Sequence, residues 1–217
     1  MTPSPLRRPE TEAERRHADA CRAGDREALD RFFRDHAGRV ERVISRLIGP
    51  TPDLEDLVQA TFIEAMRSFP AYRGEASVAS WVTRIAIHVA YHHLRKGVRR
   101  FVSLELLPEE GEPGTPGPDG ELDTRRVTSR LHGLLDKIKP KKRIAFVLYA
   151  IEGYSVDEIA AYTGASATAV KSQLFFARRE LQALVKADPV LAERAATLLR
   201  GGGALGQAGT GLEEGRS

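Results

Sequence analysis

The stretch Ser155–Leu181 reads SVDEIAAYTGASATAVKSQLFFARREL and predicts two short helices joined by a tight turn. Ser155 and Glu158 have the spacing of a capping box, in which the hydroxyl and the carboxylate each satisfy a free amide at the start of a helix. Gly164 provides the permissive backbone that a sharp turn between helices requires, and Ser166 can cap a second helix. The arrangement predicts a helix-turn-helix, a motif that places its second helix in a DNA groove.

The second predicted helix has one apolar and one polar face. Val170, Leu174 and Leu181 share a stripe at helical spacing, which leaves the opposite face for solvent or a ligand. Hydroxyl and guanidinium groups there can contact base edges and phosphates, and an aromatic ring can lie against a thymine methyl. The alternative is a helical hairpin in a globular core with a solvated basic face. The candidate DNA-contacting residues are Thr168, Lys171, Ser172, Phe175, Arg178 and Arg179.

Composition sets bounds on the rest of the chain. Its 217 residues can form one large domain or two small ones, and the net charge of +3 conceals separate basic and acidic clusters. Cys21 is the single cysteine, which excludes an internal disulfide and indicates a reducing compartment. No apolar run is long enough to cross a bilayer, so we expect a soluble cytoplasmic protein. His17 and Cys21 have the spacing of half a metal site, but zinc requires four ligands, so no metal and no cofactor is predicted.

A helix predicted over about Asp53 to Ser68 has an acidic first turn. Its apolar residues, from Leu54 to Met66, recur at helical spacing and predict a buried stripe. Acidic side chains at a helix N-terminus interact favourably with the helix dipole, which is sufficient to explain them. The functional interpretation is an acidic, amide-bearing docking face for a basic partner. Its members are Asp53, Glu55, Asp56 and Gln59.

The loop at 69–77 and a helix predicted over about 78–97 combine aromatic and basic side chains. One face of the helix is apolar and predicts a core contact, while an adjacent face interleaves aromatics and cations. A protein that holds unstacked bases needs rings for stacking and charges for the backbone. The alternative is that Trp81 and Tyr91 only cover the edge of the core. The candidate residues are Tyr72, Arg73, Trp81, Arg84, His88, Tyr91, His92 and Arg95.

A segment rich in Pro, Gly and acidic residues indicates a linker between two helical regions. Before it, a helix that follows Gly24-Asp25 is expected to bury Phe32 and Phe33; near the end of the chain, Asp188-Pro189 signals the start of one more helix. We predict an all-α fold of two small helical domains joined by a flexible acidic linker, the C-terminal domain being a helix-turn-helix. The expected parts are a disordered tail (1–9), a first domain (10–100), the linker (101–127), the helix-turn-helix domain (128–186), and an extra helix with a disordered Gly-rich tail (187–217).

Three motifs in this order resemble those of one family. The first is DLEDLVQATF at 53–62, and the second is YRGEAS at 72–77, followed by Trp81 and RIA at 84–86. The third is GYS at 153–155 with EIA at 158–160, followed by VKS at 170–172 and AR at 177–178. Over about residues 19–186 the chain resembles the bacterial RNA polymerase sigma factors of the extracytoplasmic-function group. The resemblance implies that 10–100 is sigma region 2 and 128–186 is sigma region 4.

The resemblance implies a role for each motif. The first would bind the coiled coil of the polymerase beta-prime subunit, the second would read and open the minus-ten promoter element, and the third would read the minus-thirty-five element. The implied partners are core RNA polymerase, through its beta-prime and beta subunits, promoter DNA, and an anti-sigma factor, which is often membrane-bound in this family. No catalytic centre is implied. His88 and His92 stand where relatives often have Asn, and Phe176 where they often have Arg, so the promoter sequence cannot be borrowed from a relative.

Two other functions stay open at this point. A stand-alone helix-turn-helix regulator would bind duplex DNA tightly without a polymerase, and it would not need the aromatics of the 69–95 segment. A helical nuclease could use Asp53, Glu55 and Asp56 with a metal ion. Spacing argues against the nuclease, because no second cluster of carboxylates or histidines accompanies these residues.

Overall fold

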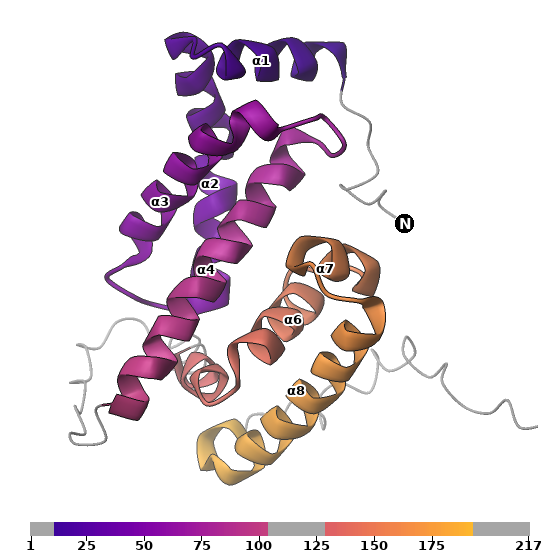
Figure 1. Cartoon of the computed structure of the whole chain (residues 1–217). Helices are drawn as coiled ribbons and strands as arrows, with labels where there is room; N and C mark the ends of the chain where they lie inside the picture. Colours follow the sequence, from indigo (N-terminus) through magenta and orange to yellow (C-terminus); the bar gives the residue numbers. More distant parts are fainter. Residues whose placement is uncertain (1–10, 104–128, 193–217) are drawn as a thin grey trace, which may run out of the picture.

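The computed structural model describes residues 11–103 and 129–192, and all regular structure within these ranges is helical (Figure 1). The prediction of an all-α fold is confirmed for this part of the chain. Residues 129–136 and 189–192 are helical as well. The named elements are α1 (Glu12–Arg22), α2 (Arg26–Ile48), α3 (Leu54–Ser68), a short 3-10 helix η1 (Phe69–Ala71), α4 (Val78–Ser103), α6 (Pro140–Ala150), α7 (Val156–Thr163) and α8 (Ala167–Ala187).

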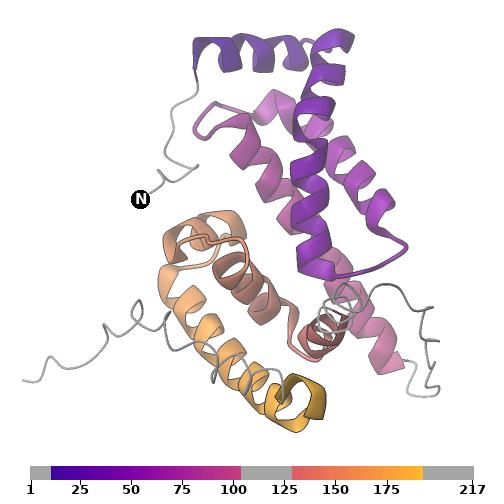
Figure 2. The same cartoon turned by 180° about the vertical axis from the view of Figure 1, so that it is seen from behind.

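The first helical bundle consists of α2, α3 and α4, with α1 crossing one end (Figures 1 and 2). The Asp25 side chain caps α2 by accepting a hydrogen bond from the Ala28 amide at 2.8 Å. Phe32 lies at the centre, with its ring centroid 5.5 Å from that of Phe62 and 5.0 Å from that of Phe69, both edge-on. Burying such side chains stabilises the fold by about 1.5–3 kcal/mol each, and edge-to-face ring pairs add to this.

Two residues expected in this core are instead exposed. Phe33 is 47% exposed and Met66 is 45% exposed, because each lies at the edge of its apolar stripe, beyond the face that the neighbouring helices cover. The Phe33 ring still packs on Phe62, with 4.7 Å between centroids. The core prediction was therefore wrong for these two side chains, since periodicity identifies the direction of a buried stripe better than its width.

The second bundle contains the predicted helix-turn-helix. The Ser155 hydroxyl accepts from the Glu158 amide at 3.2 Å, and the Glu158 carboxylate accepts from the Ser155 amide at 2.8 Å, so the capping box is present as predicted. Gly164 has φ +67° and ends α7 in the left-handed conformation. The Ser166 hydroxyl then caps α8 by accepting from the Ala169 amide at 3.1 Å. The cap and turn residues of the motif all have the predicted roles.

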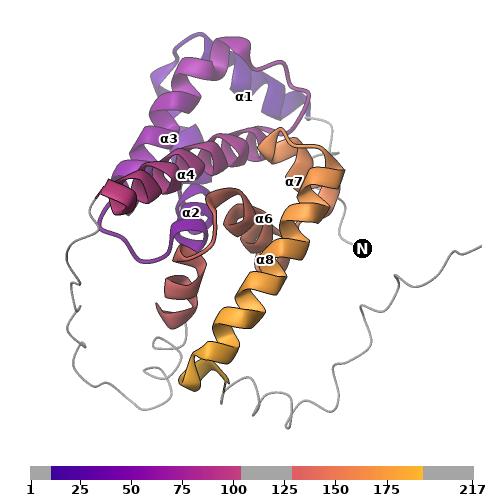
Figure 3. The ribbon, with the colours of Figure 1, turned by 60° about the horizontal axis from the view of Figure 1, so that its bottom comes forward.

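The two bundles lie against each other. Helix α4 of the first contacts both α6 and α7 of the second, and α2 contacts α6. Figure 3 shows α6 between the first bundle and α8. We call this contact between the bundles the seam. The sequence predicted two helical domains but gave no signal that they would touch.

Several predicted segments fall wholly or mostly outside the described residues. These are the tail at 1–9, nearly all of the linker at 101–127, and the chain beyond residue 192. Of the predicted C-terminal helix, the start is confirmed: residues 189–192 are helical, and the Asp188 carboxylate accepts from the amides of Val190 and Leu191, each at 3.1 Å. Within the described ranges, no helix combines the length and the apolar character that crossing a membrane requires.

Candidate functional site

The acidic face at the start of α3 is exposed to solvent. Asp53, Glu55, Asp56 and Gln59 all lie on its surface within the first two turns. Asp53 is the N-cap residue, but its side chain makes no capping hydrogen bond; its carboxylate instead lies 3.9 Å from Nε2 of His93 on α4. Asp53 is thus not occupied in capping the helix, and the four side chains form a surface that a basic partner could contact.

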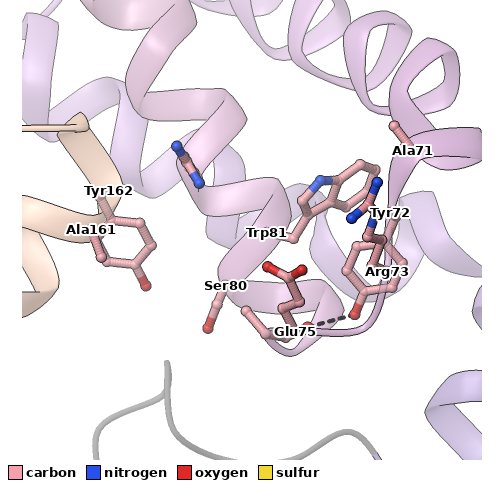
Figure 4. Close-up of a pocket in the computed structure, with 10 residues that line it drawn as sticks. Ala71, Tyr72, Arg73, Glu75, Ser80, Trp81, Ala161 and Tyr162 are labelled. Carbon is pink, nitrogen blue, oxygen red and sulfur yellow. Dashed lines mark hydrogen bonds between the residues drawn. The ribbon is translucent and has the colours of Figure 1, made fainter.

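A cavity of about 610 Å³ joins four of the residues predicted to bind single-stranded DNA. Tyr72 and Arg73 of the loop line it together with Trp81 and Arg84 of α4. Its volume is within the range of pockets that hold small organic groups. Figure 4 shows Tyr162 on the opposite side of this cavity from Trp81, so the second bundle closes part of it.

Tyr72 and Trp81 also belong to the core of the first bundle. Tyr72 is 6% exposed, and its hydroxyl donates to the Ala76 carbonyl at 2.5 Å (Figure 4), which holds the loop. The Trp81 ring lies 4.9 Å from that of Tyr72 and 4.8 Å from that of Phe69, and it is half-buried. Arg22 of α1 donates to the Tyr72 carbonyl at 2.8 Å and anchors the loop from the other side. Trp81 therefore covers the core edge and borders the cavity at once.

The other residues of this stripe are divided between two further cavities. His88 and Tyr91 border one of about 320 Å³, whose other wall comes from the second bundle. His92 and His88 border one of about 840 Å³ between α3 and α4. The Arg95 guanidinium lies 5.6 Å from the Tyr91 ring centroid, a cation–π geometry. Burial, helped by the nearby Arg84 and His92, lowers the pKa of His88 below its ordinary value.

The residues predicted to read duplex DNA form one exposed surface on α8. The largest ring there, Phe175, is 61% exposed, and Phe176 beside it is 44% exposed. Cations stack on rings along one edge: the Arg178 guanidinium lies 5.1 Å from the Tyr149 ring centroid, and the Lys142 ammonium lies 5.3 Å from that of Phe176. The exposed predicted residues are Thr168, Lys171, Ser172, Phe175, Arg178 and Arg179.

The described residues contain no group of three or more His, Cys, Asp or Glu side chains arranged to hold a metal ion. His17 and Cys21, whose spacing in the sequence is that of half a metal site, lie with Nε2 and Sγ 3.9 Å apart. Burial raises the pKa of the Cys21 thiol, so the sulfur stays protonated and is a poor metal ligand at neutral pH.

Both bundles match models of known protein families. Residues 32–100 match Sigma-70 region 2, and residues 128–181 match Sigma-70, region 4. The chain belongs to the sigma-70 factors, in their extracytoplasmic-function (ECF) group. The resemblance inferred from the three motifs is thereby confirmed.

Two named relatives come from different bacteria. The chain is 34% identical over 165 residues to the ECF RNA polymerase sigma factor SigE of Mycolicibacterium smegmatis, a match that covers 73% of this chain and 63% of the relative. It is 26% identical over 167 residues to the ECF RNA polymerase sigma-E factor of Haemophilus influenzae, covering 73% of this chain and 88% of the relative. The chain thus spans less than two thirds of the first relative and most of the second.

Two solved structures share the fold. CnrH, solved in complex with the cytosolic domain of CnrY, superposes with a TM-score of 0.57 at 25% identity, over 82% of this chain and 99% of that one. The sigma factor RpoE of Bartonella quintana, solved with the anti-sigma factor NepR, superposes with a TM-score of 0.52 at 24% identity, over 70% and 92%.

Two residues of the site were missed in the sequence of this ECF factor. Ser80 lines the main cavity from α4, and Tyr162 lines it from α7. The sequence contains no signal for a role of Ser80 at the cavity other than its position one residue before Trp81. Tyr162 lies within the helix-turn-helix, and nothing in the sequence shows that α7 packs on α4 and brings this ring to the other proposed DNA site.

Proposed function

We propose that this ECF factor binds core RNA polymerase and directs it to promoters, where it helps to open the DNA. The observation that carries the proposal is the presence of region 2 and region 4 in one chain, each with an exposed surface of suitable chemistry. The alternative of a stand-alone helix-turn-helix regulator gains no support from the acidic face on α3 or from the aromatic cavity.

The acidic face on α3 is the proposed contact with polymerase. Asp53, Glu55, Asp56 and Gln59 would dock on the coiled coil of the beta-prime subunit, where carboxylates steer association with a basic surface and fix its register. Region 4 would bring the beta subunit and the minus-thirty-five element together. Since core polymerase works in the bacterial cytoplasm, we place the action of this chain there.

The cavity beside Trp81 is the proposed minus-ten site. A base that leaves the duplex would enter between the loop and α4, with Arg73 and Arg84 near its phosphates. Unstacking costs a few kcal/mol per step, while stacking on an aromatic ring returns about 1–3 kcal/mol per base. Ring and phosphate contacts together can therefore hold an opened strand. The chain would capture the open DNA, and RNA synthesis would remain the work of the polymerase.

The exposed surface of α8 is the proposed contact with the minus-thirty-five element. Hydroxyls of Thr168 and Ser172 and cations of Lys171 and Arg179 have the chemistry for base edges and phosphates. Phe175 would lie against a thymine methyl or a sugar. An anti-sigma factor is the remaining proposed partner, since the fold is shared with an RpoE that was solved with one.

Run-off transcription tests the proposal. Purified core polymerase and a genomic promoter library are combined with and without this chain, and specific start sites are expected only when it is present. Asp56→Arg should abolish those transcripts and core binding, whereas Glu41→Arg, a matched reversal on the exposed surface of α2, should leave both intact. Tight duplex binding by the chain alone, with no initiation, would establish the regulator instead.

A further inference from the structure

Another cavity lies between α1 and the loop that borders the proposed minus-ten site. We call it the α1 cleft; its volume is about 320 Å³. Helix α1 also contacts η1, the turn that precedes this loop. Because the match to region 2 begins at residue 32, it assigns no role to α1, which ends at Arg22. The lining residues are Arg15, Ala18, Asp19 and Arg22 of α1 and Tyr72, Arg73 and Gly74 of the loop.

The α1 cleft carries an excess of positive charge. It is lined by the guanidinium groups of Arg15, Arg22 and Arg73, and by one carboxylate, that of Asp19. Arg15 and Arg22 are seven residues apart, which places them on one face of α1, about 10.5 Å apart along its axis. A planar guanidinium matches the oxygens of a phosphate with two parallel hydrogen bonds, which an ammonium cannot do. The lining therefore favours a ligand that bears phosphate groups.

Contacts with the protein orient Arg22 without using all of its donors. Its Nη1 donates to the Asp19 carboxylate at 2.5 Å, and its Nη2 donates to the Tyr72 carbonyl at 2.8 Å. A guanidinium has five N–H donors, so these two bonds leave three, and the side chain is 39% exposed. Since Arg22 is already held in place, a phosphate that binds it loses less affinity to the ordering of the side chain.

The α1 cleft adjoins the proposed minus-ten cavity. Tyr72 and Arg73 line both, and of these two only Arg73 is exposed. Gly74 follows with φ +74°, and its lack of a side chain leaves room beside the loop backbone. A strand whose base enters the cavity beside Trp81 would therefore pass over Arg73 toward α1.

We propose that the α1 cleft binds the phosphodiester backbone of single-stranded DNA next to the nucleotide held in the minus-ten cavity, with Arg15 and Arg22 as its phosphate ligands. A charged groove that follows the backbone beside an aromatic surface is a general design for binding single strands. Phosphate contacts position a strand and carry no sequence information, so the cleft adds affinity without changing the promoter preference. The place of the cleft in promoter opening rests on the function proposed above, whereas its binding of a single strand does not.

Fluorescence anisotropy of a labelled single-stranded oligonucleotide of mixed sequence tests the cleft on the full chain. Arg15→Gln should weaken binding about three- to tenfold at about 0.1 M salt, and the slope of log K against log salt should become shallower by about 0.7, the value for one phosphate contact with a single strand. Arg22→Gln should act in the same direction. Arg15→Lys keeps the charge and should retain the slope.

Arg16→Gln is the matched control, because Arg16 is exposed on the same helix but does not line the cleft. It should change neither the affinity nor the slope. Arg15→Gln is the decisive variant, since Arg22 also holds the loop through the Tyr72 carbonyl; its circular dichroism should match that of the unaltered chain. Equal losses for Arg15→Gln and Arg16→Gln would overturn the cleft as a site, and an equal loss for a duplex of the same sequence would overturn its use of single strands.

Promoter complexes separate this proposal from the sigma activity. On a promoter found by run-off transcription, open complexes of the holoenzyme should dissociate about three- to tenfold faster with Arg15→Gln at about 0.1 M salt, at unchanged start sites. A loss of single-strand affinity without any specific initiation would overturn the sigma activity alone. Specific initiation, with single-strand binding and open complexes that do not respond to Arg15→Gln, would overturn the cleft alone.

Discussion

Replacing Arg143 by methionine tests whether the buried guanidinium stabilises the chain as its contacts indicate. Arg143→Met keeps an apolar stem of similar length but leaves the Leu47 carbonyl without the 2.7 Å hydrogen bond that completes α2. An unsatisfied buried acceptor costs about 1–3 kcal/mol. Removing a buried charge offsets part of this cost, since the Arg143 Nη2 is buried without a hydrogen-bond partner. We expect a net loss of about 1–2 kcal/mol in unfolding free energy.

Urea unfolding followed by Trp81 fluorescence and by circular dichroism measures this loss. In a separate thermal melt, a loss of 1–2 kcal/mol should lower the melting temperature of a chain of this size by about 2–8 °C. Arg31→Met is the control, because Arg31 is 69% exposed on α2 and its ion pair with Asp35 is at the surface; it should change stability by less than about 0.5 kcal/mol. If Arg143→Met were as stable as this control, the hydrogen bond to Leu47 would not form in solution.

Two further predictions concern caps and pH. Ser155→Ala removes the capping box of α7 and should cost about 1 kcal/mol of stability, measured by urea unfolding, whereas Ser172→Ala on the exposed face of α8 should cost much less; equal losses would contradict the role of the cap. Burial, assisted by Arg143, lowers the pKa of His132. The stability that His132 contributes should be fully present above its unfolded pKa of about 6.5 and be lost as pH falls through the folded pKa. His132→Gln should make the unfolding free energy less pH-dependent below pH 6.5, and an unchanged slope would refute this.

The helix-turn-helix could be predicted almost residue by residue, because its signals are local. A capping box, a glycine at a left-handed turn and a serine cap each act within four residues, and a single sequence contains all of that information. The caps at Asp25, Ser155 and Ser166 are all present. Resemblance to a family then placed these local elements in two regions.

The seam could not be predicted, because its signals are not local. Arg143 follows the four basic residues Lys137, Lys139, Lys141 and Lys142 and reads as part of a solvated cluster, yet it is 1% exposed. Its partner carbonyl is 96 residues away, and a backbone acceptor has no sequence signature. The same reasoning applies to Tyr162, whose partner Ser80 lies in the other bundle. Tyr72 was expected to face DNA; it lines the cavity beside Trp81, but it is 6% exposed and also anchors the loop through its hydroxyl, a role that no sequence pattern signals.

The seam combines polar and apolar contacts. Its ends are held by the Arg143 hydrogen bond, the Arg46–Glu152 pair and the Tyr162 hydroxyl, and water can replace each of these partners when the bundles separate. Its buried apolar residues, among them Ile87 of α4 and Ile144 of α6, belong to one hydrophobic cluster that includes residues of both bundles. Burial of apolar area contributes about 25 cal/mol per Å², so hydrophobic packing holds the seam together with the polar contacts.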